Sequence, residues 1–323
     1  MRFIRLSQIL AQFYVTLQKQ SGLVDKDLKA SAARLLVADG YSKPDNKSDP
    51  VLLNIAALVI RQGRLTVHRL LPEVVAQVNE TDIRALPADP PRLLRSGAFC
   101  IEAADMAKPL YGDVICLGGY ETEGKWWLIM FALNGSVSVG VWEPQWGEGE
   151  VTEGLYFDPS PFVEVSAAET YRAVTTEGVR CALTLGALLD AEGSPIESAT
   201  QTITPPPEKR TRGSKPAKSA SWVVRNLKLM ASVRDAIARA AESAADHEAP
   251  APGSREGLHA EKRTVRGFLR RQPFGIGRSE RKWIYVAAFE SVRHVGQKPL
   301  RVNVSNTPPL PRVLSVGGPE RED

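Results

Sequence analysis

The sequence predicts a mixed α+β protein, in which N-terminal helices pack on an antiparallel β-meander and a C-terminal helix precedes a small basic β-hairpin module. Three observations support this fold class. Apolar residues recur at helical spacing near the N-terminus. Alternating apolar segments joined by turn residues run from Ala98 to Glu143, and a second strand pair, rich in Lys and Arg, lies between Lys262 and Glu290.

The N-terminal helices are predicted from apolar periodicity and from residues that begin or end helices. Helices are expected at Ile4–Leu17, Asp25–Ala38 and Pro50–Arg61, with a further segment at Leu65–Val78. Asp25 can cap the second helix and Gly40 can end it. Pro is favoured in the first turn, so Pro50 begins the third helix. His68 lies alone beside leucines, a pattern more typical of packing than of metal binding.

The β-meander is predicted from four alternating segments, Ala98–Ala103, Asp113–Tyr120, Lys125–Leu133 and Ser136–Glu143. Asn134-Gly135 indicates a two-residue hairpin turn between the last two. The third segment is apolar on both faces, so we expect it to be covered on both sides, with the N-terminal helices covering at least one. A helix at Ala167–Val174 and an apolar segment at Val179–Leu189 are expected to complete this part.

The chain is predicted to divide after residue 202. The expected parts are an α+β domain at 1–202, a Pro/basic linker at 203–221, an amphipathic helix at 222–247, a loop at 248–261, a basic β module at 262–312 and a disordered tail at 313–323. The helix is predicted from apolar residues at helical spacing, among them Val223, Leu227 and Met230. Such a stripe is typical of a core or of a dimer seam, so a homo-oligomer is possible.

Composition excludes several classes. The chain has 323 residues, of which 43% are hydrophobic and 24% charged, as in ordinary globular proteins. It has no apolar run of about 18 residues, so no membrane partner is expected. The three cysteines are far apart and match neither a disulfide framework nor a zinc site, which favours a cytoplasmic protein. No cofactor or metal is expected.

The net charge of +4 conceals an asymmetry along the chain. Residues 1–202 carry 18 Lys and Arg against 25 Asp and Glu, whereas residues 203–312 carry 22 against 9. Positive charge is therefore concentrated in the C-terminal third. This pattern indicates either a polyanionic partner or an acidic protein surface, and a merely solvated basic surface is the alternative.

The basic hairpin, with arms Lys262–Arg271 and Lys282–Glu290, is the one segment that indicates a partner. Alternation places Arg266, Phe268 and Arg270 on one side of the first arm, and Trp283 and Tyr285 on one side of the second. Cations and rings on a small sheet suit RNA or single-stranded DNA. The rings can instead form the core of a small module. The predicted nucleic-acid-binding residues are Arg263, Arg266, Phe268, Arg270, Arg271, Arg278, Arg281, Lys282, Trp283 and Tyr285.

Two enzymatic alternatives stay open, although no catalytic residue is assigned. Asp113, Glu123 and Lys125 have the order of a metal-dependent nuclease site. His259 and His294, with Arg266, Arg270 and Tyr285, are the residue types of a metal-free ribonuclease. The Gly275–Gly277 turn is a weak candidate phosphate nest. The sequence contains no G-x-S-x-G, P-loop, H-E-x-x-H or paired C-x-x-C motif.

The segment Val265-Arg266-Gly267-Phe268-Leu269-Arg270-Arg271-Gln272, followed by Arg281-Lys282-Trp283-Ile284, resembles a C-terminal signature in uncharacterised proteins of bacteriophages and other mobile elements. The pattern there is roughly V-R-G-H-W-R-x-Q followed by R-x-W-I, and its usual His is Phe268 here. The resemblance implies a bacterial or phage origin and an accessory role, without a known reaction. A weaker similarity is to ribosome-dependent mRNA interferase toxins, which also have basic strands ending in an aromatic-rich segment.

These observations favour a non-enzymatic accessory protein of a phage or mobile element that binds nucleic acid through its basic C-terminal module. A nuclease or toxin-like ribonuclease is one alternative. The other is a protein-binding inhibitor of a host system, in which the basic face meets an acidic protein.

Overall fold

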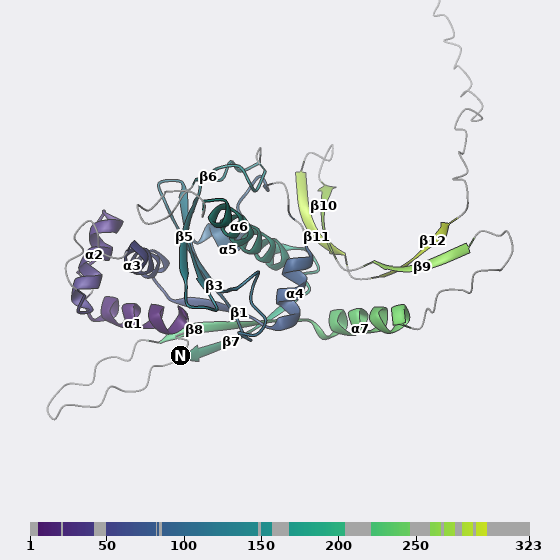
Figure 1. Ribbon diagram of the computed structural model, residues 1–323, viewed down its shortest axis with the longest axis horizontal. Helices are drawn as coiled ribbons and strands as arrows, with labels where there is room; N and C mark the ends of the chain where they lie inside the picture. The colour runs from purple at the N-terminus through teal and green to yellow at the C-terminus, as the bar shows by residue number, and fades with distance from the viewer. Residues whose placement is uncertain are drawn as a thin grey trace, which may run out of the picture.

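The computed structural model describes residues 6–20, 22–41, 50–81, 83, 86–147, 150–156, 168–203, 221–245, 259–265, 268–274, 280–286 and 289–295. Within these residues, the mixed α+β fold is organised around an eight-stranded sheet with the strand order β6-β5-β4-β3-β2-β1-β8-β7 (Figure 1). β1 is parallel to both of its neighbours, β2 and β8, and the other neighbouring strands are antiparallel.

The sheet strands are short to medium in length. They are β1 (Thr66–Leu70), β2 (Ala98–Ala103), β3 (Val114–Thr122), β4 (Lys125–Ala132), β5 (Val137–Trp142), β6 (Leu155–Tyr156), β7 (Ile196–Ile203) and β8 (Trp222–Leu229). β2 to β5 confirm the predicted meander, because their bounds fall within a few residues of the expected ones.

Three helices, α1 (Leu6–Lys19), α2 (Leu28–Ala38) and α3 (Pro50–Gln62), cover one face of the sheet (Figure 1). Their apolar side chains share a buried cluster with Cys100, Ile129 and Val224 of the strands. The cap of α2 was predicted two residues too early. Asp27, not Asp25, accepts from the backbone N–H groups of the first turn, and the Asp25 carboxylate instead accepts from the Ser31 hydroxyl at 2.9 Å.

The opposite face is covered by α4 (Pro72–Glu80), α5 (Arg92–Arg95) and α6 (Ala168–Asp190). α6 is one continuous helix, whereas the sequence predicted a shorter helix and a separate apolar segment. In the central strand β4, Trp126, Leu128 and Met130 pack into this second cluster, and Ile129 packs into the first. The expectation of cover on both faces is therefore confirmed.

The two hairpin turns of the meander differ in length, and the one at Asn134-Gly135 is longer than predicted. Glu123 and Gly124 both have positive φ, 54° and 79°, and join Thr122 to Lys125 as a two-residue turn of the type I′ class. At Asn134-Gly135, only Gly135 has positive φ, 85°. There the Ala132 N–H donates to the Ser136 carbonyl at 2.9 Å, so the loop has three residues instead of two.

Two predicted helical segments contain strands. The segment Leu65–Val78 is β1 followed by α4, and the helix expected at 222–247 is β8 followed by α7 (Ala231–Ala245). In β8, Trp222 and Val224 face the α1–α3 cluster, while Leu227 and Leu229 face the other. The segment is therefore a strand, although its apolar spacing suggested a helix. β8 lies between β1 and β7 and packs into a cluster on each face, so it has apolar residues on both sides.

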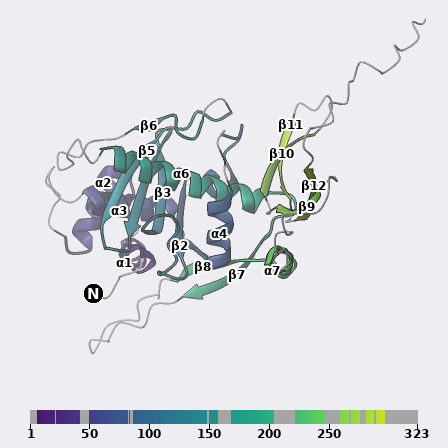
Figure 2. The ribbon, with the colours of Figure 1, turned by 45° about the vertical axis from the view of Figure 1, so that its right-hand side comes forward.

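The basic hairpin forms two separate two-stranded ladders. β10 (Phe268–Phe274) pairs with β11 (Glu280–Val286), and β9 (His259–Val265) pairs with β12 (Phe289–Val295). β9 begins inside the predicted loop 248–261. Figure 2 shows the β10–β11 ladder beside α4 and α6, away from α1 and α2. α7 contacts β9 and β12.

Several predicted segments lie outside the described residues: 204–220 of the linker, 246–247 of the helix, 248–258 of the loop, the Gly275–Gly277 turn and the tail 313–323. Among the described helices, none combines the length and the apolar composition that a membrane span requires.

Candidate nucleic-acid interface and neighbouring pockets

The β10–β11 ladder is attached to the main body through Glu192, which follows α6. The Glu192 N–H donates to the Trp283 carbonyl at 3.1 Å, and the Tyr285 N–H donates to the Glu192 carbonyl at 3.2 Å. The Lys282 ammonium also pairs with the Glu192 carboxylate. Because the N–H and the carbonyl of Glu192 both bond to the backbone of β11, they fix the position of β11 relative to α6.

The inner face of this ladder is part of the core. Tyr285 is 7% exposed and its hydroxyl donates to Gln77 Oε1 at 3.3 Å. Burial, and to a lesser extent the charge of Glu80, raises the pKa of Tyr285. Trp283 and Leu269 pack against the same cluster. In this arrangement, the rings of Trp283 and Tyr285 join the ladder to the body.

The outer face carries the exposed groups. Phe268, Arg270 and Gln272 alternate along β10 and are exposed, with Phe268 at 38%. Their cross-strand partners are Val286, Ile284 and Lys282, and directly opposed residues share a face. The set of cations and rings predicted for this small sheet is therefore divided between its two faces, with Phe268 and Arg270 on one face and Trp283 and Tyr285 on the other.

The remaining predicted contact residues are placed by their backbone alone. Arg263 is opposite Ser291 in the β9–β12 ladder, while Arg271 and Arg281 are opposite Trp283 and Pro273 in the β10–β11 ladder. Arg266 and Arg278 lie outside the described residues. Nucleic-acid contact by this set of residues stays a prediction.

The nuclease arrangement proposed from Asp113, Glu123 and Lys125 is wrong. Asp113 precedes β3, and its carbonyl accepts from the Leu133 N–H at 2.8 Å, whereas Glu123 follows the other end of the same strand. A nine-residue strand separates them by about 30 Å, too far to share a metal ion. The described residues contain no group of three or more His, Cys, Asp or Glu placed to hold a metal.

The ribonuclease alternative also lacks a common site. His259 is opposite Val295 and His294 is opposite Ala260, at the end of the β9–β12 ladder where β9 begins. Arg270 and Tyr285 lie in the β10–β11 ladder. The seven residues of β9 alone extend about 20 Å, so the backbone positions do not bring the histidines beside Arg270 or Tyr285.

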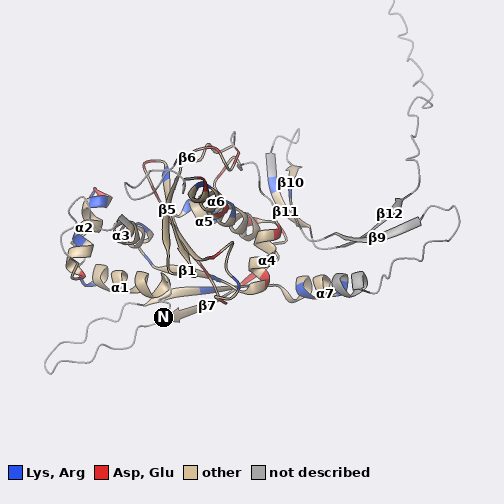
Figure 3. Cartoon of the chain, in the orientation of Figure 1, with Lys and Arg blue, Asp and Glu red and all other residues tan. Residues whose placement is uncertain are grey.

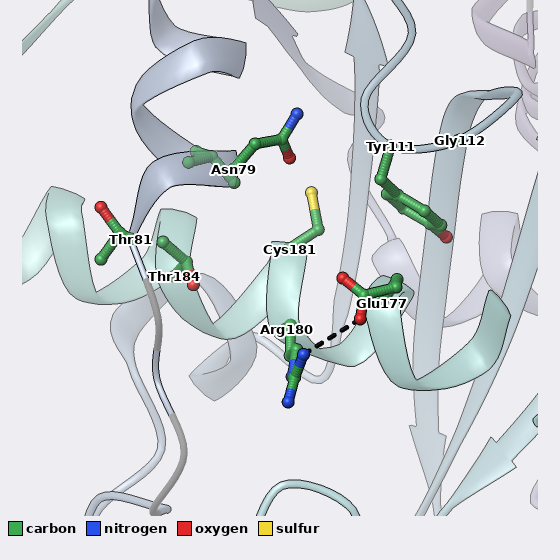
Figure 4. Close-up of a pocket in the computed structure, with 9 residues that line it drawn as sticks. Asn79, Thr81, Tyr111, Gly112, Glu177, Arg180, Cys181 and Thr184 are labelled. Atoms are coloured by element: carbon green, nitrogen blue, oxygen red, sulfur yellow. Dashed lines mark hydrogen bonds and ion pairs between the residues drawn. The ribbon is translucent and has the colours of Figure 1, made fainter. Parts of the chain in front are cut away.

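A cavity of about 510 Å³ lies between α4, α6 and the loop before β3, lined by Val78, Asn79, Thr81, Tyr111, Gly112, Glu177, Arg180, Cys181 and Thr184. Figure 4 shows the Cys181 sulfur pointing between Asn79 and Tyr111. Burial, followed by the charge of Glu177, raises the pKa of Cys181 to about 12, and burial also raises the pKa of Tyr111. Both groups stay protonated at neutral pH, so the cavity lacks an activated nucleophile.

A second cavity, of about 370 Å³, lies where the starts of β1 and β8 meet α5 and the end of α6. It is lined by Gln62, Arg64, Thr66, His68, Arg92, Leu93, Ser96, Ala98, Phe99, Leu189, Asp190 and Arg225. From the sequence, His68 was expected to be a packing residue, and no site was predicted from the other lining residues. No local motif unites the lining residues, because they come from segments that only the fold brings together.

Positive charge is distributed over the described surface. Figure 3 shows Lys and Arg on α2, on α7 and on the β10–β11 ladder. Other cations are neutralised, for example Lys228 of β8 by Glu197 at 3.2 Å and Arg61 of α3 by Glu121 at 2.9 Å. The outer face of β10 retains an exposed guanidinium beside an exposed ring.

Comparison with known proteins adds little. No protein-family model and no curated protein matches the sequence. The chain is similar to a solved structure, the crystal structure of AcrVA2, with a TM-score of 0.42 and 12% sequence identity over 87% of this chain and 93% of that chain. A likeness this distant carries no argument about function.

Proposed function

We propose that this protein binds single-stranded nucleic acid through the outer face of the β10–β11 ladder, without catalysing a reaction. The observation that carries the proposal is the division between the two faces. Tyr285 and Trp283 hold the inner face against the body, while Phe268, Arg270 and Gln272 are exposed together on the outer face.

The three exposed groups supply complementary interactions. A base stacks on an exposed ring with a gain of about 1–3 kcal/mol, and Phe268 is such a ring. A guanidinium binds phosphate oxygens through a planar set of donors, and Arg270 provides it. The Gln272 amide can both donate to and accept from a base edge. A ladder fixed to the body at Glu192 presents these groups with little ordering cost.

The resemblance of the Val265–Gln272 and Arg281–Ile284 segments to a phage and mobile-element signature supports an accessory role. In the proposed role, the main α+β body positions the ladder, and the ladder makes the contact.

The test is fluorescence anisotropy with labelled 20-nucleotide RNA and DNA homopolymers, titrated with the full chain at several salt concentrations. Phe268→Ala should weaken binding by about 5- to 150-fold, because stacking is lost. Arg270→Ala should weaken binding of all sequences and reduce the salt slope by about 1. Arg172→Ala on α6, a similarly exposed arginine away from the ladder, is the matched control. The proposal fails if the wild-type chain does not bind at low salt, or if both ladder variants bind as tightly as the control.

A protein partner is a second candidate, because large apolar side chains are exposed at the same end of the molecule. Met230 is 41% exposed, Ile237 39% and Phe289 45%. A photoreactive residue in place of Phe289 should then give protein adducts in cells that survive nuclease treatment. Adducts that disappear with nuclease would favour the nucleic-acid proposal.

A further inference from the structure

The cavity of about 370 Å³ at the starts of β1 and β8 is electropositive. Arg64, Arg92 and Arg225 line it, and within the described residues their side chains form no ion pair. Asp190 is the one acid among the lining residues, and its carboxylate already accepts from the Arg92 N–H at 2.6 Å. With neutral His68, the lining carries three positive charges and one negative charge, a net charge of +2.

Two of the lining residues also carry a buried acceptor without a partner. Gln62 directs its Nε2 to the Thr66 carbonyl at 2.6 Å, whereas its Oε1 is buried and has no hydrogen-bond partner among the described residues. His68 Nδ1 is likewise buried and has no hydrogen-bond partner among the described residues. Buried polar atoms in native proteins are almost always paired, so two unpaired acceptors on residues that line one cavity suit a ligand with donor groups.

His68 is held neutral by its surroundings. Burial and then the charge of Arg225, its cross-strand neighbour, lower the pKa of His68 to about 4. A hydrogen bond to the Cys100 backbone acts in the opposite direction, as expected when the ring donates to a carbonyl. A neutral ring that donates through one nitrogen has an acceptor at the other, so Nδ1 is the acceptor of this ring.

Arginine forks match phosphate oxygens, and neutral acceptors match the N–H and O–H groups of a base or sugar. The cavity volume falls within the range of about 300–1,000 Å³ that is usual for small-molecule sites. We propose that this cavity binds a small phosphomonoester carrying hydrogen-bond donors, of the nucleoside monophosphate class. Arg64, Arg92 and Arg225 bind the phosphate, while Gln62 and His68 accept from the nucleoside. This site is separate from the β10–β11 ladder and does not rest on its proposed function.

The test is isothermal titration calorimetry on the full chain, after any copurifying nucleotide has been removed. The probes are the four common ribonucleoside monophosphates, the corresponding nucleosides, inorganic phosphate and succinate. At least one monophosphate should bind, and its nucleoside should bind at least about tenfold more weakly. Absence of binding by all four monophosphates up to about 1 mM overturns the proposal, as does succinate binding that equals the best monophosphate.

Variants then assign the roles. Arg225→Gln and Arg64→Gln should each weaken monophosphate binding at least about tenfold, while Arg172→Gln leaves it unchanged. The Arg225 and Arg64 side chains are exposed, so these substitutions should retain the fold. The melting temperature without ligand checks this. Gln62→Met should weaken the monophosphate but not inorganic phosphate. Arg270→Ala should leave monophosphate binding unchanged, because Arg270 does not line the cavity. Failure of the cavity proposal can therefore be distinguished from failure of the ladder proposal. Unchanged binding by Arg225→Gln and Arg64→Gln overturns the assignment.

Discussion

The guanidinium of Arg69 on β1 donates to one carboxylate oxygen of Glu102 on the neighbouring parallel strand β2, from Nη2 at 2.6 Å and from Nε at 2.7 Å. The Glu102 side chain is 1% exposed and that of Arg69 is 20% exposed. The two residues are register partners, so the ion pair joins the antiparallel meander to the parallel part of the sheet.

Glu102→Gln should lower the free energy of unfolding by about 3 kcal/mol, because it leaves the Arg69 charge in a nearly buried site without its counter-charge. Urea unfolding at neutral pH measures this loss. Glu197→Gln is the matched control, since the Lys228–Glu197 pair is exposed on both sides and should cost less than about 1 kcal/mol. Equal losses in the two variants would contradict the role of burial.

Gly140→Ala should destabilise the contact of α6 with β5 by about 1–3 kcal/mol. A Cβ at residue 140 would lie 2.4 Å from the Thr175 Cγ2 and Oγ1 atoms, so one of the two elements must shift. Thr175→Ala in the same chain should recover part of the loss, giving a coupling energy of at least about 0.5 kcal/mol in a double-mutant cycle. Strictly additive losses would show that the helix accommodates the methyl group elsewhere.

Tyr285→Ala should release the β10–β11 ladder from the body, because it removes the buried ring and its hydrogen bond to Gln77. Hydrogen exchange should then accelerate at least about tenfold in β10 and β11 but not in β3 and β4. Phe268→Ala, on the exposed face of the same ladder, should leave these rates unchanged. Faster exchange in the Phe268 variant would indicate that both faces are packed.

His68 should make the protein less stable in mild acid. Its pKa is about 4 in the folded state against 6.5 for the ordinary side chain, so the unfolded chain takes up the proton first as the pH falls. No effect is expected above about pH 7; the penalty develops between about pH 6.5 and 4 and reaches on the order of 3 kcal/mol. In urea unfolding, His68→Asn should lose this part of the pH dependence. Identical pH profiles for both proteins would contradict a neutral buried ring.

The β-meander could be predicted because its information is local. Alternation in Lys125–Leu133 shows a strand apolar on both faces, and short turns join consecutive segments. β1 and β8 could not be predicted in this way, since each is stabilised by a partner distant in sequence. Val223 and Leu227 are also four residues apart, a spacing that fits one face of a helix as well as two residues on one face of a strand.

The sequence predicted which residue types form the candidate interface, but not which of them share a face of the ladder. Alternation assigns residues to sides within each arm, but only the register relates one arm to the other. Phe268 is opposite Val286 and Leu269 is opposite Tyr285, so Phe268 and Tyr285 lie on opposite faces of the ladder. The arginine-lined cavity was not predictable at all, because Gln62 and Arg225 meet only once the sheet has formed.

The position of β8 has a consequence for synthesis of the chain. β1 can pair with β8 only after a segment about 150 residues downstream has left the ribosome. Until then, one edge of β1 is unpaired and the neighbouring apolar side chains are not covered by β8. A fragment that stops before Trp222 would retain most of the helices but would expose an unpaired parallel strand edge. Such a fragment should aggregate, and the nascent chain has most need of a chaperone over the same interval.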